Sequence, residues 1–423
     1  MTDHKDIVII GAGQAGLSTS YHLTQLGREH LVLEQADTSF PSWHKRWDSF
    51  SLVLPNWTVQ LPGSPVASSQ ADGFFTKAEL LEHLADFTDN FEPPVRYGVR
   101  VLALEKNERP HRFLLHTNQG SLEADNVVVA TGTYQEPRLP AFSADLSPDI
   151  FQLHTDEYLN PEQLPSGAVL VVGSGQSGCQ IAEELYQSGR KVYLSVSSAN
   201  RIPRVYRGRD SVWWLGKMHF FDQTVDQLKT SQERFAANPL FSGKNGGHDI
   251  NLHQFYRDGV ILLGRMQGAR GSHIYLETDL HDNLEKSDLF VSQVQQGIDA
   301  FIAKQALEAP PPPSDPPLQD AYQAPIIEEL DLAAEGISTV LWGTGYTYDF
   351  SWIRLPVLDQ DGYPIQERGI SPYAGLYFMG LYWLHDRKSG LLWGVGQDAE
   401  YIAQHIALNT QAKMESQQLQ HQR

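Results

Sequence analysis

The stretch Gly11-Ala12-Gly13-Gln14-Ala15-Gly16 decides the fold. It follows a short β-branched run at residues 6–10, and helix-favouring residues continue after it to residue 26. A second apolar run at residues 30–34 then ends in Glu34. Glycines at these spacings permit a tight turn and let a pyrophosphate approach the N-terminus of the following helix. The pattern therefore predicts a βαβ unit that binds a dinucleotide, and Glu34 is placed to accept hydrogen bonds from a ribose diol.

A second stretch, Gly173-Ser174-Gly175-Gln176-Ser177-Gly178, repeats the construction after the apolar run at residues 168–172. The position equivalent to Glu34 is here Val196, followed by Ser197 and Ser198, with Arg201 and Arg204 soon after. The carboxylate of the first unit favours FAD or NAD. Hydroxyl and guanidinium groups suit a ribose 2′-phosphate, so the second unit is predicted to bind NADPH. Alternatively, the two arginines belong to a solvated loop or a domain interface.

The order of predicted elements indicates an insertion. Between the two units, residues 98–105 and 112–116 have the pattern of antiparallel strands. After the second unit, the proline-rich run at residues 310–317 has the pattern of an extended spacer. We expect an α/β protein with two Rossmann-like dinucleotide-binding domains, the NADPH domain inserted into the FAD domain. The expected boundaries are residues 1–150 and 321–410 for the FAD domain, 151–320 for the NADPH domain, and 411–423 for a polar tail.

Composition narrows the partners. Lys and Arg total 32 against 51 Asp and Glu, a formal charge of −19 that disfavours nucleic acid and anionic lipid. The single cysteine, Cys179, excludes an internal disulfide and a Cys-x-x-Cys redox pair, which fits a reducing cytoplasm. No secretory signal or membrane-spanning apolar run is evident. The 16 histidines form no H-x-x-x-H or H-E-x-x-H arrangement, so we expect no metal site.

Further motifs carry a family resemblance over nearly the whole chain. They are Val129-Ala130-Thr131-Gly132-Thr133-Tyr134, Trp342-Gly343-Thr344-Gly345-Tyr346, Arg46-Trp47-Asp48-Ser49, Leu54-Pro55-Asn56-Trp57, Gly208-Arg209-Asp210 and Arg387-Lys388-Ser389-Gly390-Leu391-Leu392-Trp393-Gly394-Val395-Gly396. With the two glycine stretches, they make the chain similar to class B flavin-dependent monooxygenases: flavin-containing monooxygenases, YUCCA-type enzymes and CzcO-like flavoproteins. The resemblance implies that NADPH reduces FAD, that oxygen adds to the flavin, and that the hydroperoxide transfers one oxygen atom to a small organic substrate.

The resemblance also implies site residues. We expect Asn56, in the Leu-Pro-Asn-Trp segment, to donate a hydrogen bond near the reactive edge of the flavin, although a role in the turn beside Pro55 is as compatible with the sequence. Arg46 is expected at the FAD pyrophosphate or paired with Asp48 or another exposed acid. The predicted cofactor contacts are Gly11, Gly13, Gln14, Ala15, Gly16, Glu34, Gln35, Trp43, Arg46, Val101, Ala130, Thr131, Gly132, Gly173, Ser174, Gly175, Gln176, Ser177, Gly178, Arg201 and Arg204.

One departure keeps other functions open. The monooxygenase fingerprint F-x-G-x-x-x-H-x-x-x-aromatic retains His154 and Tyr158, but Pro148 and Ile150 replace its phenylalanine and glycine. We expect His154 to be a hinge or interface residue rather than an acid or base. The alternatives are an NADPH-dependent reductase or oxidase that inserts no oxygen, and a flavin-binding sensor without turnover. The sequence leaves room for a homo-oligomer.

Overall fold

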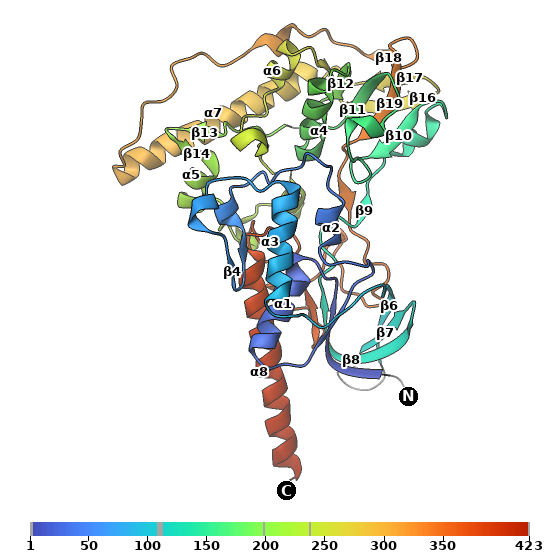
Figure 1. Ribbon diagram of the computed structural model, residues 1–423, viewed down its shortest axis with the longest axis vertical. Coiled ribbons are helices and arrows are strands. Elements are labelled where there is room, and N and C mark those ends of the chain that lie inside the picture. Colours follow the sequence, from blue (N-terminus) through green and yellow to red (C-terminus); the bar gives the residue numbers. More distant parts are fainter. Residues whose placement is uncertain (1–2, 108–112, 198, 237, 422–423) are drawn as a thin grey trace.

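Two β-sheets, each built around one of the glycine stretches, form the framework of the molecule (Figure 1). The structure is a computed structural model that describes residues 3–107, 113–197, 199–236 and 238–421. The first sheet lies in the lower half of Figure 1, and the second lies above it. The mixed α/β class expected from the sequence is confirmed.

The first sheet has seven strands. β5 (Val95–Arg96), β2 (Leu31–Leu33), β1 (Asp3–Ile10), β8 (Gly120–Val129) and β21 (Leu376–Phe378) pair in parallel, whereas β7 (Phe113–Thr117) and β6 (Val101–Lys106) add an antiparallel edge. β8 is long enough to pair with β7 along its first half and with β21 along its second. Helix α1 (Gln14–Gln25) packs against α8 (Val395–His421), and α3 (Lys77–Asp89) begins with a Thr76–Glu79 capping box.

The second sheet is entirely parallel, in the order β10 (Phe151–His154), β19 (Ile337–Trp342), β11 (Ala168–Val172), β12 (Val192–Ser195) and β15 (Ile261–Leu263). Every residue of β11 is buried, as expected of a central strand that is covered on both faces. Helix α4 (Gln176–Gln187) follows β11, and α7 (Leu280–Gln305) extends across the top of the molecule (Figure 1). A small antiparallel sheet of β16 (Met266–Arg270), β17 (His273–Leu276) and β18 (Glu329–Asp331) lies beside it.

The chain leaves the first sheet after β8 and returns to it at β21, so the second sheet is an insertion. The two crossing segments pair with each other as β9 (Glu136–Pro137) and β20 (Tyr346–Thr347). The predicted return at residue 321 is wrong, because β18 and β19 still belong to the inserted part. The apolar run in β19 fills the space between β10 and β11, and the chain crosses back only after Trp342. The predicted polar tail begins inside α8, which ends at His421.

Short elements complete the two parts. They are the helices α2 (Pro41–His44), α5 (Ser211–Lys217) and α6 (Leu252–Arg257), the hairpins β3 (Gln60–Leu61) with β4 (Ser64–Pro65) and β13 (Val205–Tyr206) with β14 (Arg209–Asp210), and the 3₁₀ turns Asn56–Thr58, Ser68–Gln70, Ala141–Asp145, Pro161–Gln163, Val225–Gln227, Ser231–Phe235, Lys244–Gly246 and Asp320–Gln323. The proline-rich run at residues 310–317 forms no helix or strand and returns from α7 along the surface (Figure 1).

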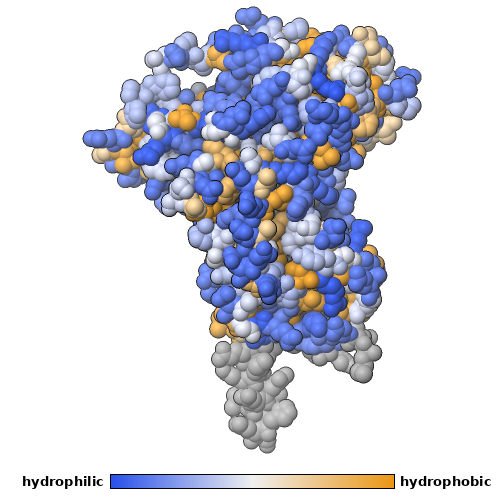
Figure 2. Space-filling view, viewed as in Figure 1, coloured by the Kyte–Doolittle hydropathy of each residue, from blue (hydrophilic) through white to orange (hydrophobic). Residues whose placement is uncertain are grey.

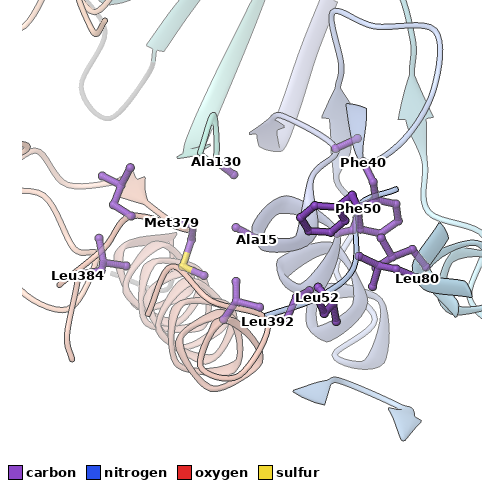
Figure 3. Packing of buried hydrophobic residues seen from close by; sticks show 14 of the residues in the cluster. Ala15, Phe40, Phe50, Leu52, Leu80, Ala130, Met379, Leu384 and Leu392 are labelled. Atoms are coloured by element: carbon purple, nitrogen blue, oxygen red, sulfur yellow. The ribbon is translucent and has the colours of Figure 1, made fainter. Parts of the chain in front are cut away.

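The main core reaches the first glycine stretch. Figure 3 shows side chains from α1, from the loop after α2 and from the C-terminal segment gathered around Ala15. Gly380 has a φ of +74°, and a Cβ atom there would lie 2.5 Å from the Cβ of Ala15. The segment after β21 therefore packs directly on the start of α1. On the face drawn in Figure 2, hydrophobic side chains show along the narrow middle, where the two parts of the molecule meet.

A matched pair of substitutions tests the packing at the second glycine stretch, where Gly178 in α4 lies against the backbone of Gly173. We expect Gly178→Ala to lower the free energy of unfolding by about 1–3 kcal/mol, the usual cost of overpacking, because the added Cβ would overlap the carbonyl oxygen of Gly173. Gly175→Ala is the control, since a Cβ at Gly175 meets nothing within 4 Å. Urea denaturation followed by far-UV circular dichroism measures both. Equal destabilisation of the two variants would contradict the packing described here.

Candidate dinucleotide-binding site

The first glycine stretch is a turn with three distinct glycine positions. Gly11 has a φ of +107°, and a Cβ atom there would lie 2.6 Å from the carbonyl oxygen of Ala130. A Cβ at Gly16 would overlap the carbonyl oxygen of Gly11, so this glycine lets α1 pack against the turn. At Gly13 a Cβ would meet nothing within 4 Å. The first and third glycines therefore serve packing, and the second leaves room for a ligand.

The second stretch has the same construction. Gly173 has a φ of +110° and approaches Gly343, whose carbonyl oxygen would lie 2.5 Å from an added Cβ. Gly178 packs on Gly173, and Gly175 faces open space. Both α1 and α4 begin without a side-chain cap, at Gly13 and Gly175. Backbone N–H groups of the first turn of a helix have no partner within the helix, so each helix start can bind an anionic group such as a pyrophosphate.

The link between strand end and turn differs in the two units. Glu34 is buried, and its carboxylate accepts hydrogen bonds from the Ala12 N–H at 2.7 Å and the Ala36 N–H at 2.9 Å. In the second unit the direction is reversed, because the Ser174 hydroxyl accepts from the Ser197 N–H at 3.1 Å. A strand end and a turn are thus tied together without a carboxylate. Val196 stands at the position equivalent to Glu34 and, because it carries no charge, does not repel a ribose 2′-phosphate.

One large cavity, of about 1090 Å³, joins the two parts of the molecule. Fourteen of the predicted cofactor residues line it: Gly11, Gly13, Gln14, Ala15, Glu34, Gln35, Trp43, Arg46, Val101, Ala130, Thr131, Gly132, Gln176 and Ser177. Gly16, Gly173, Ser174, Gly175 and Gly178 lie beside these residues in the turns but do not line the cavity. The cavity therefore reaches the start of both α1 and α4, so ligands at the two turns would share one space.

Glutamine side chains at the two helix starts fix the cavity walls. The Gln14 amide donates to the carbonyl oxygen of Gly390 at 2.9 Å and accepts from the Trp43 indole N–H at 3.1 Å. The Gln176 amide donates to the carbonyl oxygen of Phe241 at 2.5 Å and accepts from the N–H of the same residue at 3.1 Å. Each glutamine therefore holds a distant chain segment in front of its own glycine turn.

Arg46 brings a positive charge to the cavity. Its guanidinium group lies over the ring of Tyr134, 4.7 Å from the ring centre, and near Trp43 and Phe50. Among the described residues no carboxylate lies within ion-pair distance of Arg46, and its buried Nε has no hydrogen-bond partner. Asp48, the alternative partner, contacts Lys77 and Asn160. A cation at the cavity wall without a carboxylate fits an anionic ligand.

Arg204 lies at the interface between the two parts, and Arg201 is paired within the inserted part. The guanidinium group of Arg201 pairs with Asp288 at 2.5 Å, and that of Arg204 pairs with Asp210 at 2.7 Å. Arg204 also donates to the carbonyl oxygen of Val53 at 2.7 Å and lies between the rings of Phe74 and Phe241. Neither side chain lines the cavity. Their predicted contact with a 2′-phosphate stays a prediction, and it would require these ion pairs to break first.

Asp288 explains how strongly Arg201 is held. Burial acts to raise the pKa of this carboxyl, but hydrogen bonds from His253, Arg201 and Tyr322 outweigh it and lower the pKa to about 2. The carboxylate is therefore ionised at neutral pH and stays bound to the guanidinium group. The positive charge of Arg201, which was predicted to bind a phosphate, is thus already neutralised by Asp288 of α7.

Asn56 is also placed differently from the prediction. Its side-chain amide donates to the carbonyl oxygen of Gln70 at 3.0 Å and accepts from the N–H of Phe75 at 2.6 Å. The residue is buried and does not line the cavity. The turn role that the sequence left open is the one observed, whereas the contact of Asn56 with a flavin stays a prediction that this geometry does not support. Asn56 holds the loop of residues 70–75 against the 3₁₀ turn that carries Trp57.

His154, at the end of β10, is bonded to the segment that crosses back to the first part. The Asp156 N–H donates to its Nδ1 at 3.1 Å, so Nε2 carries the proton and donates to the carbonyl oxygen of Gly345 at 3.1 Å. Burial lowers the pKa of His154, which keeps the ring neutral. Tyr158, the other retained fingerprint residue, donates to Glu184 of α4 at 2.9 Å. Both side chains are structural, as expected for His154.

Sequence reasoning missed several cavity residues. The hydroxyl groups of Tyr134 and Tyr382 lie 3.1 Å apart at the cavity wall. Phe221 contacts Trp393, with ring centres 4.7 Å apart, and Trp393 in turn meets Trp57 edge-on at 4.9 Å. Tyr134 and Trp393 lie in motifs named above, but no local pattern indicates that Phe221 reaches the cavity from the inserted part.

Neither thiol chemistry nor metal binding is favoured by the described residues. Burial raises the pKa of Cys179 to about 12, and its thiol donates to the carbonyl oxygen of Ser174 at 3.3 Å. A thiol in this state is a poor nucleophile. Across the described ranges, no cluster of three or more His, Cys, Asp or Glu residues is arranged to hold a metal ion.

Among the helices that the structure describes, none combines the length and apolar character needed to cross a bilayer.

The comparisons with known proteins agree with this geometry. The family model for pyridine nucleotide-disulphide oxidoreductases matches residues 8–212. A CzcO-like oxidoreductase of Geobacillus kaustophilus is 33% identical over 403 residues, which cover 95% of this chain and 98% of the relative. A flavin-containing monooxygenase from Stenotrophomonas maltophilia has a similar structure, with a TM-score of 0.65 and 18% identity over 97% of this chain and all of its own. The OTEMO complex with FAD and NADP aligns with a TM-score of 0.59 and 14% identity over 97% of this chain and 86% of its own.

Fold and site together define a two-domain oxidoreductase of the dinucleotide-binding class. The chain belongs to the family of CzcO-like oxidoreductases. The resemblance noted from the motifs is thereby confirmed. The word disulphide in the name of the matched family model does not extend to this chain, because its one cysteine cannot form a redox pair.

A buried carboxyl near the cavity predicts a dependence of stability on pH. Burial raises the pKa of Asp398, in the first turn of α8, to about 6, and one of its oxygens has no partner among the described residues. Because this pKa lies above that of the unfolded chain, the stabilising contribution is complete at low pH and is lost as pH rises through about 6.

We therefore expect the free energy of unfolding of Asp398→Asn, relative to that of the wild type, to increase as the pH rises from 4 to 8. The full difference is about 3 kcal/mol, the equivalent of two pKa units. Urea unfolding at the two pH values measures it, and Glu400→Gln on the same helix is the control. A difference between Asp398→Asn and wild type that does not change with pH would contradict the assignment.

Proposed function

We propose that the chain is an FAD-containing, NADPH-dependent monooxygenase that transfers one atom of oxygen to a small organic substrate. The observation that carries the proposal is the pair of uncapped helix starts that open into one cavity. A passive FAD-binding protein has no need of the second turn. The family relationship, the fold of the flavin-containing monooxygenase and the FAD and NADP named for OTEMO support it.

The residues fit FAD at the first turn. Gly13 leaves space for a pyrophosphate beside the free N–H groups of α1, and Arg46 supplies a nearby positive charge. Glu34 keeps lone pairs for a ribose diol, although both of its oxygens already accept backbone N–H groups. Flavin supplies the redox chemistry when it is bound, and the protein supplies position and exclusion of water. In this proposal the first sheet and α8 form the FAD domain.

The second turn is proposed to bind NADPH through Gly173, Ser174, Gly175, Gln176, Ser177 and Gly178. Support comes from the missing carboxylate at Val196 rather than from Arg201 and Arg204, which are engaged elsewhere. Val196 carries no charge and so does not repel a 2′-phosphate as a carboxylate would, which favours NADPH. The single cysteine and the negative charge support a cytoplasmic protein that acts on small molecules rather than on nucleic acid.

Flavin binding is tested at Gly13. We expect Gly13→Ala to unfold like the wild type, because its Cβ meets no protein atom within 4 Å, but to bind FAD at least tenfold more weakly. The reason is that the methyl group occupies the space where a pyrophosphate must approach the backbone. Fluorescence titration of the flavin-free protein with FAD measures the affinity. Gly297→Ala is the control, because this residue lies outside the cavity and an added Cβ there would meet only the Met218 side chain, at 3.5 Å. Unchanged FAD affinity in Gly13→Ala would place the flavin elsewhere.

Oxygen insertion is tested on the whole protein. We expect anaerobic NADPH to bleach the yellow absorbance of the bound flavin faster than NADH does. Under oxygen-18 gas, a panel of thioethers and amines is then expected to yield products that carry one labelled oxygen atom, as mass spectrometry would show. The replacement of the fingerprint positions by Pro148 and Ile150 favours one alternative, a reductase or oxidase without oxygen insertion.

The same assay separates the alternatives. Rapid bleaching followed only by hydrogen peroxide, in amounts equal to the NADPH consumed, would favour the oxidase. A flavin that NADPH does not bleach at any concentration would favour the sensor. Either result overturns the proposed oxygen transfer.

A further inference from the structure

One side of the large cavity is formed by a hydrophobic cluster that is separate from the main core. Residues from both parts of the molecule pack in this cluster. We name those of its members that also line the cavity the apolar wall: Val53, Leu54, Phe221, Phe241, Leu391 and Trp393. The insertion supplies Phe221 and Phe241, and the first part supplies the others. The apolar wall therefore spans the junction of the two parts.

Aromatic contacts hold the apolar wall in place. The ring centres of Phe221 and Trp393 lie 4.7 Å apart, and Trp393 meets Trp57 edge-on at 4.9 Å. A Cβ atom added at Gly216 of α5 would lie 3.2 Å from the ring of Trp393. Side chains from three separate segments thus surround this ring, which leaves it little room to move.

The apolar wall stands in front of both helix starts. The Gln14 side chain, at the start of α1, donates to the carbonyl oxygen of Gly390, the residue before Leu391. The Gln176 side chain, at the start of α4, bonds to both the N–H and the carbonyl oxygen of Phe241. If the two pyrophosphates bind at these helix starts, the cofactors have to exchange hydride between them, beside the apolar wall.

The charged residues that line the cavity come from other segments. They are Glu34, Lys45, Arg46, Arg100, Glu136, Asp156, Asp349 and Arg354, and none of them belongs to the cluster of the apolar wall. In the proposed function, Glu34 meets the ribose end of FAD and Arg46 its pyrophosphate. These two charges therefore serve the cofactor, and the apolar wall itself offers a ligand no charge.

Two cations approach the apolar wall without lining the cavity. The guanidinium group of Arg204 lies 4.7 Å from the ring centre of Phe241, and the ammonium group of Lys388 lies 6.0 Å from that of Trp393. Each of these cations is paired with an aspartate. Among the described residues, the apolar wall thus has no cation ready to bind an anionic substrate.

We propose that the organic substrate is an uncharged, largely apolar molecule that binds against the apolar wall. This inference rests on the proposed function, because it takes the cofactors to occupy the two turns. Burial of apolar surface favours such a ligand. An ionised carboxylate or ammonium group would instead lose its water there without gaining a partner. A substrate that depends on a carboxylate for binding is therefore excluded.

Three matched thioethers test the proposal: thioanisole, para-(methylthio)benzoate and para-(methylthio)benzylammonium, which are neutral, anionic and cationic at neutral pH. Equilibrium dialysis against the FAD-loaded protein, with NADP⁺ present, measures their binding without turnover. We expect thioanisole to bind about tenfold more tightly than either charged analogue, or better, because burial of an unpaired charge is costly. A protein that binds none of the three, or binds a charged analogue as tightly as thioanisole, overturns the proposal.

A charge placed in the apolar wall tests its position. Leu54 lines the cavity and is only partly buried, so Leu54→Lys brings an ammonium group to the cavity surface. We expect this variant to bind para-(methylthio)benzoate about tenfold more tightly than the wild type does, through a new ion pair. Leu54→Met is expected to keep the preference for thioanisole. Leu289→Lys, at an exposed position of α7 outside the cavity, controls for the added charge.

The outcomes separate this inference from the proposed function. A Leu54→Lys variant with the circular dichroism and FAD affinity of the wild type, but no gain in affinity for the benzoate, overturns the placement of the substrate. If that variant does not fold, the ranking of the three thioethers by the wild type decides. A chain that binds no FAD contradicts the proposed function, and the same ranking, measured on the flavin-free protein, then decides the character of the apolar wall.

Discussion

The close approach of two backbone segments at each glycine turn is the constraint on which the rest of the structure depends. Gly11 lies against Ala130 and Gly173 lies against Gly343, at distances that no residue with a side chain could accept. Ala130 and Gly343 stand at the two places where the chain crosses between the sheets. The turns that prepare the ligand sites therefore also fix the crossings, and with them the way in which the two parts share one cavity.

Duplication of the turn did not duplicate its chemistry. In the first unit a strand-end carboxylate accepts from the turn, and in the second a turn hydroxyl accepts from the strand end. Both arrangements satisfy a buried N–H group, which would otherwise be costly. Only the first leaves a negative charge at the ribose position. One change in hydrogen-bond direction thus distinguishes the two sites while the backbone geometry stays the same.

The parts of this molecule that local sequence predicts are the turns and strands, where residue type follows from backbone geometry. Glycine spacing and apolar runs were sufficient for β1, α1, β11 and α4. The predicted return crossing lies too early because the apolar run of β19 does not reveal which sheet the strand joins. Its pairing with β10 and β11 is set by tertiary structure, whereas the proline-rich run at residues 310–317 lies before it in the chain. The surroundings of Arg204 and Asn56 could not be predicted for a related reason: their partners, Asp210, Val53, Gln70 and Phe75, are set by tertiary packing.

The overall charge of −19 makes this division of roles necessary. A dinucleotide is anionic, so the attraction must come from local groups that the surrounding field does not cancel. Several cationic side chains are already paired, Arg201 with Asp288 and Lys388 with Asp222 among them. The first pair lies within the inserted part and the second joins the two parts, whereas Arg46 and the helix starts keep their capacity for a ligand. Carboxylates in this protein thus determine which cations hold the fold together and which are left to bind a ligand.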